Sequence, residues 1–443
     1  MKIHIHCIGI GGIGVSALAR LYRARGYRVS GSDLTRSEIT DALRREGIRV
    51  FIGPHRRSNL APGVTRAVYS VAAKPSNPEL VEAKQRGIET KTYAQAVGEL
   101  TGRYRAIAVA GAHGKSTTAA MIALAMTKAD LDPTIIIGTK LRELKNSNFR
   151  RGKSPYLVLE ADEYRASFLN YSPAIAVITN IDREHLDFYK TIANIERTFL
   201  RFLCGLRLGG VAVLNRDDRR LGRIALRLRR ARPDVRIVWY SLRDPAAEKI
   251  GRAIRIAGRH NISNAMAACA VGRLLRIPEK KILAAIGAYR GSWRRFDYQG
   301  LFAGAKVFAD YAHHPTEIKA TLAAAREKFP RSRIWCVFQP HHYERTRDLF
   351  KEFAGAFGGC DGLILLDIYE VAGREQNRKS GAVSSETLAA AVNRRGTPAL
   401  YLPNPERRLK AFLKTSLRPG DVLLMMGAGS IWEMTKLLMG RRT

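Results

Sequence analysis

The sequence predicts an α/β protein built from parallel sheets and organised in three domains. Short β-branched and aromatic runs alternate with amphipathic helical stretches along the chain, which is typical of parallel α/β units. Two glycine-rich loops each follow such a run and precede a helical stretch. Several later runs end at polar clusters, and open α/β sheets bind ligands at the carboxyl ends of their strands. A length of 443 residues with 46% hydrophobic content can form two or three cores.

The first domain is expected over residues 1–102, with strands in 4–10, 27–33 and 66–72. Gly9, Gly11 and Gly14 complete a G-x-G-x-x-G pattern after the first strand, and a helix is expected over 16–25. Asp33 ends the second strand, at a distance where an acidic residue often meets a ribose hydroxyl. The loop therefore suits NAD or any other nucleotide diphosphate, although such glycines can also simply close a tight turn.

The second domain is expected over residues 103–290 and opens with a strand in 106–110. A second glycine loop follows, consisting of Gly111, His113, Gly114, Lys115, Ser116 and Thr117. The full Walker pattern needs glycine at Val109, but the order strand, Gly-Lys-Ser, helix is kept. Loop N–H groups, the lysine and the serine hydroxyl are the groups that hold ATP phosphates and Mg²⁺. We therefore expect an ATP site here.

Acidic residues follow two neighbouring strands of this domain. Glu160 ends the run 156–160 and is followed by Asp162 and Glu163. The run 174–178 is followed by Asp182, His185 and Asp187. Carboxylates at strand ends beside such a loop commonly hold Mg²⁺, whereas His185 would be an unusual ligand for an ion that prefers oxygen.

The third domain is expected over residues 291–443. Its strands lie in 305–310, 333–338, 361–366 and 421–426. Paired histidines follow the first two of these strands, at 313–314 and 341–342, and two such pairs at successive strand ends favour a shared site over plain loops.

The chain is strongly basic, with 75 Lys and Arg against 39 Asp and Glu and a net charge of +36. The densest run spans 219–236. Such a run can bind nucleic acid, but no aromatic residues are interleaved for base stacking, so a solvated basic helix face is preferred. A basic cleft would also suit an anionic small substrate.

Several protein classes are excluded by other features. No run of about 18 apolar residues exists, and the N-terminus lacks the pattern of a signal peptide, so we expect no membrane association. The five cysteines form no C-x-x-C pair, which disfavours a zinc ribbon or disulfide framework and fits a reducing cytoplasm.

A set of motifs along the chain resembles the Mur ligases. In order they read GIGGIG, GSD, GAHGKSTT, EADEYRASFL, TNIDREHLDFY, GRHNISNAMAA, RRF, DYAHHPTEIKATLAAAR and FQPHHYERTRDLF. The likeness covers about residues 3–435, and DYAHHPTE with FQPH is far more specific than either glycine loop. Within the family, the chain looks most like the branch that attaches L-alanine to UDP-N-acetylmuramate.

The resemblance implies a fold and a reaction. The fold would comprise a Rossmann-like N-terminal domain, a P-loop central domain with a mostly parallel sheet, and a Rossmann-like C-terminal domain. ATP with Mg²⁺, or Mn²⁺ in its place, would convert the substrate carboxylate to an acyl phosphate, which the amino acid attacks in peptidoglycan precursor synthesis. The first loop would then hold UDP, with no nicotinamide involved. We expect a cytoplasmic monomer or homodimer that binds neither membrane nor nucleic acid.

The resemblance also assigns the nucleotide site. The second glycine loop would hold the phosphates, with Ser116, Glu160 and His185 as metal ligands. Adenine recognition and closure over the nucleotide would fall to Asn261, Asn264, Arg295 and Asp310. The other reading of Asn261 is a helix cap. The catalytic set would comprise Lys115, Glu160, His185, His313 and Arg345.

The substrate contacts implied by the resemblance fall in two groups. The UDP group comprises Gly9, Gly11, Gly12, Gly14, Ser32, Asp33, Ser70 and Asn77. The muramoyl carboxylate and the amino acid would meet His313, His314, His341 and Arg345. The chain departs from the family pattern at Ala112, Ala309, His342 and Ser430.

Three alternatives stay open at this stage. A related ligase could join another amino acid or a preformed peptide to the same sugar nucleotide. A nicotinamide oxidoreductase would explain the first loop and Asp33, but it would not need the second loop. A nucleic-acid-stimulated P-loop ATPase would explain the charge, and its activity would rise with polynucleotide and fall steeply with salt.

Overall fold

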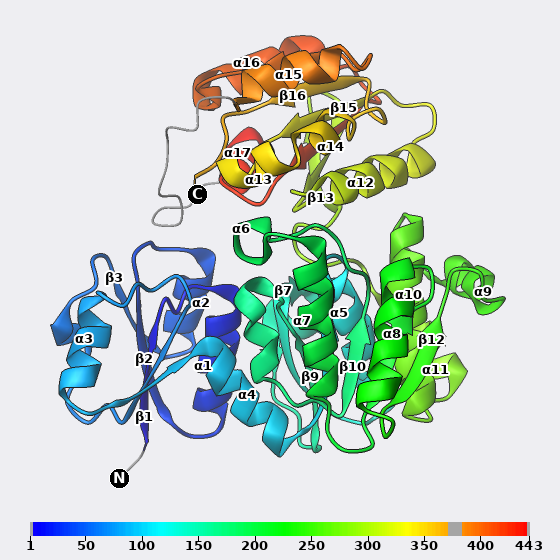
Figure 1. The fold of residues 1–443 in the computed structure, drawn as a ribbon. Coiled ribbons are helices and arrows are strands. Elements are labelled where there is room, and N and C mark those ends of the chain that lie inside the picture. The colour runs from blue at the N-terminus through cyan, green and yellow to red at the C-terminus, as the bar shows by residue number, and fades with distance from the viewer. Residues whose placement is uncertain (1–2, 371–382, 441–443) are drawn as a thin grey trace. The chain divides into compact units, whose positions relative to one another are not determined.

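A computed structural model describes residues 3–370 and 383–440, which fold as two compact units (Figure 1). The first unit contains the described residues up to Arg183, together with Thr191–Ile254 and Ser263–Tyr289. The second unit contains Glu184–Lys190, Arg255–Ile262 and the described residues from Arg290 onward. Among the described residues, no helix is both long enough and apolar enough to cross a membrane.

The first sheet has the order β3-β2-β1-β4-β5 and is parallel throughout. Its strands are β1 (His4–Ile8), β2 (Arg28–Asp33), β3 (Arg49–Ile52), β4 (Arg66–Tyr69) and β5 (Glu89–Thr92). The helical segments between and after them are α1 (Ile13–Ala24), α2 (Glu38–Arg45), η1 (Arg57–Asn59), α3 (Pro78–Gln85) and α4 (Tyr93–Arg103). The order, with β1 central, brings the carboxyl ends of β1, β2 and β4 together beside the first glycine loop.

The second sheet, also in the first unit, has the order β12-β11-β10-β6-β9-β7-β8. Its strands are β6 (Arg105–Ala110), β7 (Thr134–Leu141), β8 (Ser147–Arg150), β9 (Tyr156–Glu160), β10 (Ile175–Ile178), β11 (Val211–Asn215) and β12 (Arg236–Tyr240). All pairings are parallel except that of β7 with β8, so the predicted mostly parallel sheet is confirmed.

The helical segments that accompany this sheet are η2 (Arg142–Leu144), η3 (Tyr164–Asn170), α5 (Lys115–Lys128), α7 (Ile192–Cys204), α8 (Arg219–Ala231), α9 (Ala246–Ala253), α10 (Arg259–Leu274) and α11 (Glu279–Ala288). Helix α5 is rich in alanine and is buried on most sides, packing against α11, β7 and β9. A helix that is apolar all round is stable only when enclosed in this way. Enclosure fixes the N-terminus of α5, where the second glycine loop ends.

The third sheet forms the second unit, in the order β13-β14-β18-β15-β16-β17, with only β13 antiparallel among the described strands. Its strands are β13 (Asp297–Phe302), β14 (Ala305–Asp310), β15 (Ile334–Phe338), β16 (Gly362–Leu365), β17 (Ala399–Tyr401) and β18 (Val422–Met426). Helices α12 (Pro315–Lys328), α14 (Phe350–Ala354) and α15 (Ser385–Asn393) contribute to the apolar core on one face. Helices α16 (Pro405–Ser416) and α17 (Ile431–Leu438) contribute to the core on the other. The short helices α6 (Leu186–Tyr189) and α13 (Tyr343–Asp348) complete this unit.

The predicted α/β fold class with mostly parallel sheets is thus confirmed, with one sheet in each of the three predicted domains. Helix α4 ends at Arg103 and β6 begins at Arg105 within one compact unit, while the second unit takes up the chain again at Arg290. The division at residues 102 and 290 stays a prediction.

Candidate active site

The second glycine loop joins β6 to α5 in a backbone conformation that requires glycine. Gly111 has a φ of +136°, and a Cβ added to it would lie 2.1 Å from the Thr179 hydroxyl oxygen. Gly114 has a φ of +82° directly before α5, and its added Cβ would lie 2.3 Å from Asn264 Oδ1. Because no side chain caps α5, its first N–H groups are left to bind an anion.

Residues at the end of β10 hold this loop. The His113 amide donates to Asn180 Oδ1 at 2.9 Å, and the His113 carbonyl accepts from the Thr179 hydroxyl at 2.6 Å. The His113 ring lies with Nε2 3.0 Å from Asp182 Oδ2. His113 thus fixes the loop to the next strand. Thr179 and Asn180 were not predicted as site residues, although they follow the buried strand β10 directly.

Lys115 is paired with an acidic residue that the sequence analysis did not assign as a catalytic group. Its Nζ lies 3.0 and 2.9 Å from the two carboxylate oxygens of Glu163 and donates to the Gly111 carbonyl at 2.7 Å. Burial alone would lower the pKa of Lys115, but the neighbouring carboxylates, Glu163 and Asp162 first, outweigh burial and raise it. Lys115 therefore remains a cation at any physiological pH.

Ser116 and Glu160 meet beside the loop. The Ser116 hydroxyl donates to Glu160 Oε2 at 3.0 Å, and the Gly138 amide of β7 donates to Oε1 at 2.5 Å. A hydroxyl and a carboxylate oxygen this close suit the hard oxygen coordination of Mg²⁺. His185 lies in the second unit, with a φ of +56° directly before α6. Its assignment as a metal ligand stays a prediction.

The two asparagines expected at the adenine lie in different surroundings. Asn264 is buried in α10, and its side-chain oxygen lies beside Gly114, so the structure brings it to the glycine loop. Asn261 belongs to the second unit, and its Nδ2 donates to the Ala257 carbonyl at 2.7 Å. The Asn261 amide thus bonds the local backbone, and the role of both residues at adenine stays a prediction.

The first glycine loop has the geometry expected for a diphosphate cradle. The Gly11 amide donates to Asp33 Oδ2 at 2.8 Å, so Asp33 lies directly beside the loop. A Cβ added to Gly14 would lie 2.8 Å from the ring of Tyr93, and one added to Gly9 would lie 3.0 Å from Ser70 Cβ. Gly12 precedes α1 without a side-chain cap, which again leaves N–H groups for an anion.

A buried carboxylate, Glu79, lies beside Ser32 of β2 and was missed by the sequence analysis. Ser32 donates to Glu79 Oε2 at 2.6 Å, and Asn59 donates to Oε1 at 2.6 Å. The rings of His6 and His55 each lie 3.1 Å from a Glu79 oxygen. Two features of the sequence could have indicated this cluster. His4 and His6 lie on one face of the first strand, and an acidic residue directly follows Asn77 and Pro78.

This cluster determines the charge of Glu79. Burial would raise the pKa of Glu79, but the hydrogen bonds from His55, His6 and two further donors outweigh burial and hold the pKa far below its usual range. The pKa of His55 is raised, chiefly by its hydrogen bond to Glu79. Asn77 accepts the Glu79 amide at 2.9 Å and thereby caps α3. In this structure Ser32 and Asn77 therefore form hydrogen bonds with Glu79, and their contacts to UDP stay predictions.

In the second unit a second buried carboxylate organises several predicted residues. Arg345 Nη2 donates to Glu184 Oε1 at 2.6 Å, and His314 Nε2 lies 3.9 Å from Glu184 Oε2. Burial would raise the pKa of Glu184, but Arg345 and the nearby histidines hold it well below its usual range. The His341 ring stacks on Tyr369 with centroids 5.4 Å apart, and its centroid lies 6.3 Å from that of His313. Glu184 was not predicted, although it sits in the quoted motif before His185.

Arg295 and His313 are joined through Glu317, which was also missed, whereas Asp310 bonds the backbone. Arg295 donates to Glu317 Oε1 at 3.3 Å, and the His313 amide donates to Oε2 at 3.0 Å. Asp310 accepts the Phe296 and Ala312 amides at 2.7 Å each. Burial raises the pKa of Asp310, and the backbone bonds keep its carboxylate turned to its own loop.

The departures from the family pattern fit their surroundings. Ala309 is buried in β14, and Ser430 exchanges hydrogen bonds with Gln339, whose Nε2 donates to the serine hydroxyl at 3.0 Å. His342 begins α13 with a φ of +71°. Ala112 donates its amide to the Asn180 carbonyl at 3.1 Å. None of these contacts explains why the chain differs from its relatives here.

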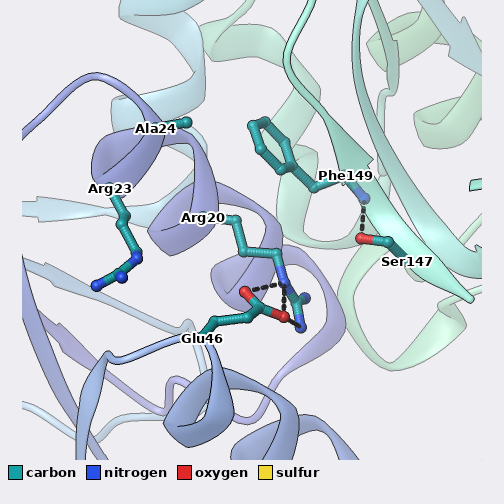
Figure 2. Close-up of a pocket in the computed structure, with 6 residues that line it drawn as sticks. All are labelled: Arg20, Arg23, Ala24, Glu46, Ser147 and Phe149. Carbon is teal, nitrogen blue, oxygen red and sulfur yellow. Dashed lines mark hydrogen bonds and ion pairs between the residues drawn. The ribbon is translucent and has the colours of Figure 1, made fainter. Parts of the chain in front are cut away.

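A separate hollow of about 380 Å³ lies between α1 and β8 (Figure 2). Its lining residues are Arg20, Arg23, Ala24, Glu46, Ser147 and Phe149, and none of them is a predicted site residue. Glu46 accepts both Arg20 Nε and Arg20 Nη2, at 2.8 to 3.0 Å. The hollow is therefore a feature of the α1–β8 contact and not part of the candidate active site.

Comparison with known proteins gives one family along the chain. Residues 4–105 match the model "Mur ligase family, catalytic domain", residues 109–253 the "Mur ligase middle domain" and residues 294–429 the "Mur ligase, glutamate ligase domain". The chain is 39% identical to UDP-N-acetylmuramate–L-alanine ligase of Clostridium acetobutylicum over 99% of this chain and 97% of the relative. It is 41% identical to the enzyme of that name from Geobacter sp. strain M21, with the same shares covered.

Solved structures agree on the fold. The crystal structure of UDP-N-acetylmuramate-alanine ligase from Thermotoga maritima superposes with a TM-score of 0.80 at 24% identity, covering 99% of both chains. A murein peptide ligase from Psychrobacter arcticus gives a TM-score of 0.72 at 22% identity, covering 100% of both chains. At these identities the two structures support the fold alone.

Proposed function

Because this chain belongs to the Mur ligase family, we propose that it joins L-alanine to the carboxylate of UDP-N-acetylmuramate at the expense of ATP. The product is an amide, released with ADP and phosphate, in the synthesis of peptidoglycan precursors. Curated relatives of this activity match the chain over nearly its whole length, at 39 to 41% identity.

One observation carries the chemical part of the proposal: a cation and a hydroxyl–carboxylate pair lie together at the N-terminus of α5. Lys115 supplies the cation, and Ser116 and Glu160 supply the oxygens. Phosphoryl transfer needs little covalent help from a protein and depends on positioning and on stabilising negative charge. Ser116 and Glu160 would hold Mg²⁺, which neutralises charge on the phosphates when bound.

The first step activates the carboxylate. A carboxylate oxygen of the muramoyl group attacks the γ-phosphorus of ATP, the bond to the bridging oxygen breaks, and ADP leaves with the electron pair. Lys115 stabilises the charge that spreads over the transferring phosphoryl group. The α5 N-terminus and the loop N–H groups, held by His113, fix the phosphates for in-line attack.

The second step forms the amide. The uncharged amino group of alanine attacks the acyl phosphate carbon and a tetrahedral intermediate forms. The nitrogen then gives up one proton to solvent, and phosphate leaves with the electron pair as the C–O bond breaks. We assign His313, His314, His341 and Arg345 to the reacting carboxylate and the amino acid. Glu184 supports this assignment, because it stays ionised and orients the Arg345 guanidinium.

The remaining assignments follow the resemblance. Asn261, Asn264, Arg295 and Asp310 would meet the nucleotide, and the first glycine loop with Ser32, Asp33, Ser70 and Asn77 would meet UDP. The contact between the Gly11 amide and Asp33 supports the second group. We place the reaction in the cytoplasm, in agreement with five cysteines that all remain free thiols.

Two alternatives are less well supported. A nicotinamide oxidoreductase would have no use for the assembled Lys115, Ser116 and Glu160 groups. A ligase for a preformed peptide would share the fold, but the curated relatives cited here act with L-alanine. One methyl group gives only modest discrimination, so alanine, serine and glycine have to be compared directly.

The test is phosphate release from ATP and Mg²⁺ in the presence of UDP-N-acetylmuramate and a panel of amino acids and short peptides. We expect release that requires the sugar nucleotide and is greatest with L-alanine, and none from Lys115→Ala. Release that needs no sugar nucleotide, or that prefers a peptide, would contradict the proposal.

A further inference from the structure

The β7–β8 hairpin of the first unit contacts helix α1, directly behind the first glycine loop. The contact centres on Asn148 of β8, whose side chain is 1% exposed. Its Nδ2 donates to the Ile13 carbonyl at 2.5 Å and to the Ser16 hydroxyl at 3.1 Å, and its Oδ1 accepts from Arg20 Nη1 at 2.7 Å. Figure 2 shows the neighbours of Asn148 in β8, Ser147 and Phe149, facing α1 across the hollow.

These bonds fix α1 at its first turn. Ile13 is the first residue of α1 and follows Gly12, so the Asn148 amide holds the helix immediately after the glycines. The N–H groups that would bind the diphosphate lie at this same turn. The three hydrogen bonds of Asn148 therefore help to hold the N-terminal half of α1 in place.

The same hairpin contacts the proposed metal carboxylate. Gly138 of β7 donates its amide to Glu160 Oε1 at 2.5 Å, while Glu160 Oε2 accepts from Ser116. A Cβ added to Gly138 would lie 2.8 Å from a Glu160 oxygen, so a larger residue here would displace the Glu160 carboxylate from its present position. One two-stranded element thus contacts Glu160 through β7 and α1 through β8.

Further contacts make the connection stiff. Lys140 of β7 pairs with Glu38, the first residue of α2, at 2.8 Å. Just after β8, the Arg151 guanidinium donates to the Ala24 carbonyl at the end of α1. The hairpin therefore contacts α1 at both of its ends. A shift of Glu160 on metal binding would move β7, and α1 could not stay in place without breaking buried hydrogen bonds.

We propose that Asn148 is a positioning residue that couples the two substrate sites: occupation of the Ser116–Glu160 site by ATP and Mg²⁺ changes the affinity of the first glycine loop for the UDP-sugar through the β7–β8 hairpin. This inference rests on the function proposed above. The coupling is reciprocal, so UDP-N-acetylmuramate changes the affinity for the nucleotide by the same factor.

The test is calorimetric titration of the full chain with UDP-N-acetylmuramate, with and without a non-hydrolysable ATP analogue and Mg²⁺. Two variants are compared with the wild type, each checked for its unfolding temperature. Asn148→Ala removes the side-chain amide, and Asn148→Asp keeps an acceptor for Arg20 but loses the donor groups. Ser147→Ala is the matched control, because within the described part of the chain this hydroxyl accepts only from the Phe149 amide, at 3.1 Å.

In the wild type and in Ser147→Ala we expect the analogue to change the dissociation constant of UDP-N-acetylmuramate by about five-fold or more. In both Asn148 variants the ratio of the dissociation constants with and without the analogue should fall towards one. The KM for the sugar nucleotide should also rise by a larger factor than that by which kcat falls. The inference alone would be overturned if folded Asn148 variants showed the same change in dissociation constant as the wild type. It would also be overturned if the wild type bound both ligands but the analogue did not change the dissociation constant of UDP-N-acetylmuramate. A wild type that does not bind UDP-N-acetylmuramate would overturn the proposed function and the inference with it.

Discussion

At the scale of single residues, the proposed function requires Lys115 to exchange one anionic partner, Glu163, for the phosphates of ATP. In this structure its ammonium group is paired with the buried carboxylate of Glu163, and it can reach a transferring phosphoryl group only by giving up part of that contact. The pair keeps the charge compensated in a buried site, where an unpaired cation is costly.

Replacing Glu163 should therefore separate stability from nucleotide binding. In Glu163→Gln the Lys115 charge loses its partner, and we expect a loss of about 3 kcal/mol of unfolding free energy without nucleotide. ATP with Mg²⁺ should raise the unfolding temperature of this variant by more than it raises that of the wild type, because phosphate oxygens replace the missing anion. Thermal unfolding with and without nucleotide measures both effects. Equal nucleotide shifts in the two proteins would mean that Glu163 does not compete for Lys115.

The buried cluster around Glu79 predicts a pH dependence. The folded pKa of Glu79 lies below its ordinary value of 4.5, so its ionised form contributes stability above about pH 4.5, and this contribution is lost as the pH falls through the folded pKa. Glu79→Gln should cost about 2 to 3 kcal/mol at pH 7 and should lose stability less steeply in acid than the wild type.

Urea unfolding between pH 7 and pH 3 measures this difference. Glu82→Gln is the control, because Glu82 lies on the same helix but has only a long contact of 4.0 Å to Arg57. If Glu79→Gln and the wild type lost stability with the same slope, the hydrogen bonds to His6 and His55 would not hold Glu79 in its ionised form.

At the scale of elements, the basic run 219–236 forms α8, the turn after it and the first residue of β12. Leu221, Ile224 and Leu228 of α8 are buried, and α8 packs beside α7, as Figure 1 also shows. Arg223 pairs with Glu196 of α7 at 2.6 Å. The structure thus agrees with the preferred interpretation, a solvated face of a helix that packs against its own unit.

The exposed arginines of α8 should be dispensable for the reaction. Arg219, Arg227 and Arg230 have no ion-pair partner among the described residues. Changing all three to glutamine should leave kcat and KM within about two-fold and stability within about 0.5 kcal/mol, because the change also relieves like-charge repulsion at i, i+4 spacing. Changing Arg45, Lys84 and Arg103 is the control for net charge. ATP hydrolysis that RNA stimulates in the wild type and not in the α8 variant would instead favour the nucleic-acid-stimulated ATPase.

The sequence predicts well those features that are encoded in one short stretch of the chain. Both glycine loops, their strands and helices, and the meeting of Ser116 with Glu160 follow from short patterns at strand ends. Glu79 and Asn148 could not be found in this way. Glu79 meets His6 because α3 packs near β1, and Asn148 reaches α1 because β8 turns back beside β7. Such contacts depend on strand order and pairing, which one sequence does not specify.

At the scale of the whole molecule, the three sheets provide the three parts that a ligase of this kind needs. Under the proposed function, the first glycine loop would hold the sugar nucleotide, the second would hold ATP, and the third sheet would supply a set of histidines with Arg345. The β7–β8 hairpin contacts both α1, which follows the first glycine loop, and Glu160, the proposed metal ligand. The central claim is that these parts perform one reaction that passes through an acyl phosphate.

The most direct test uses UDP-N-acetylmuramate labelled with ¹⁸O in its carboxylate, incubated with the wild-type chain, L-alanine, ATP and Mg²⁺. The attacking carboxylate oxygen becomes the bridge of the acyl phosphate and leaves with phosphorus, so each amide formed should be matched by one inorganic phosphate carrying one ¹⁸O. Amide formed with unlabelled phosphate, or with the label in AMP, would contradict the acyl phosphate route.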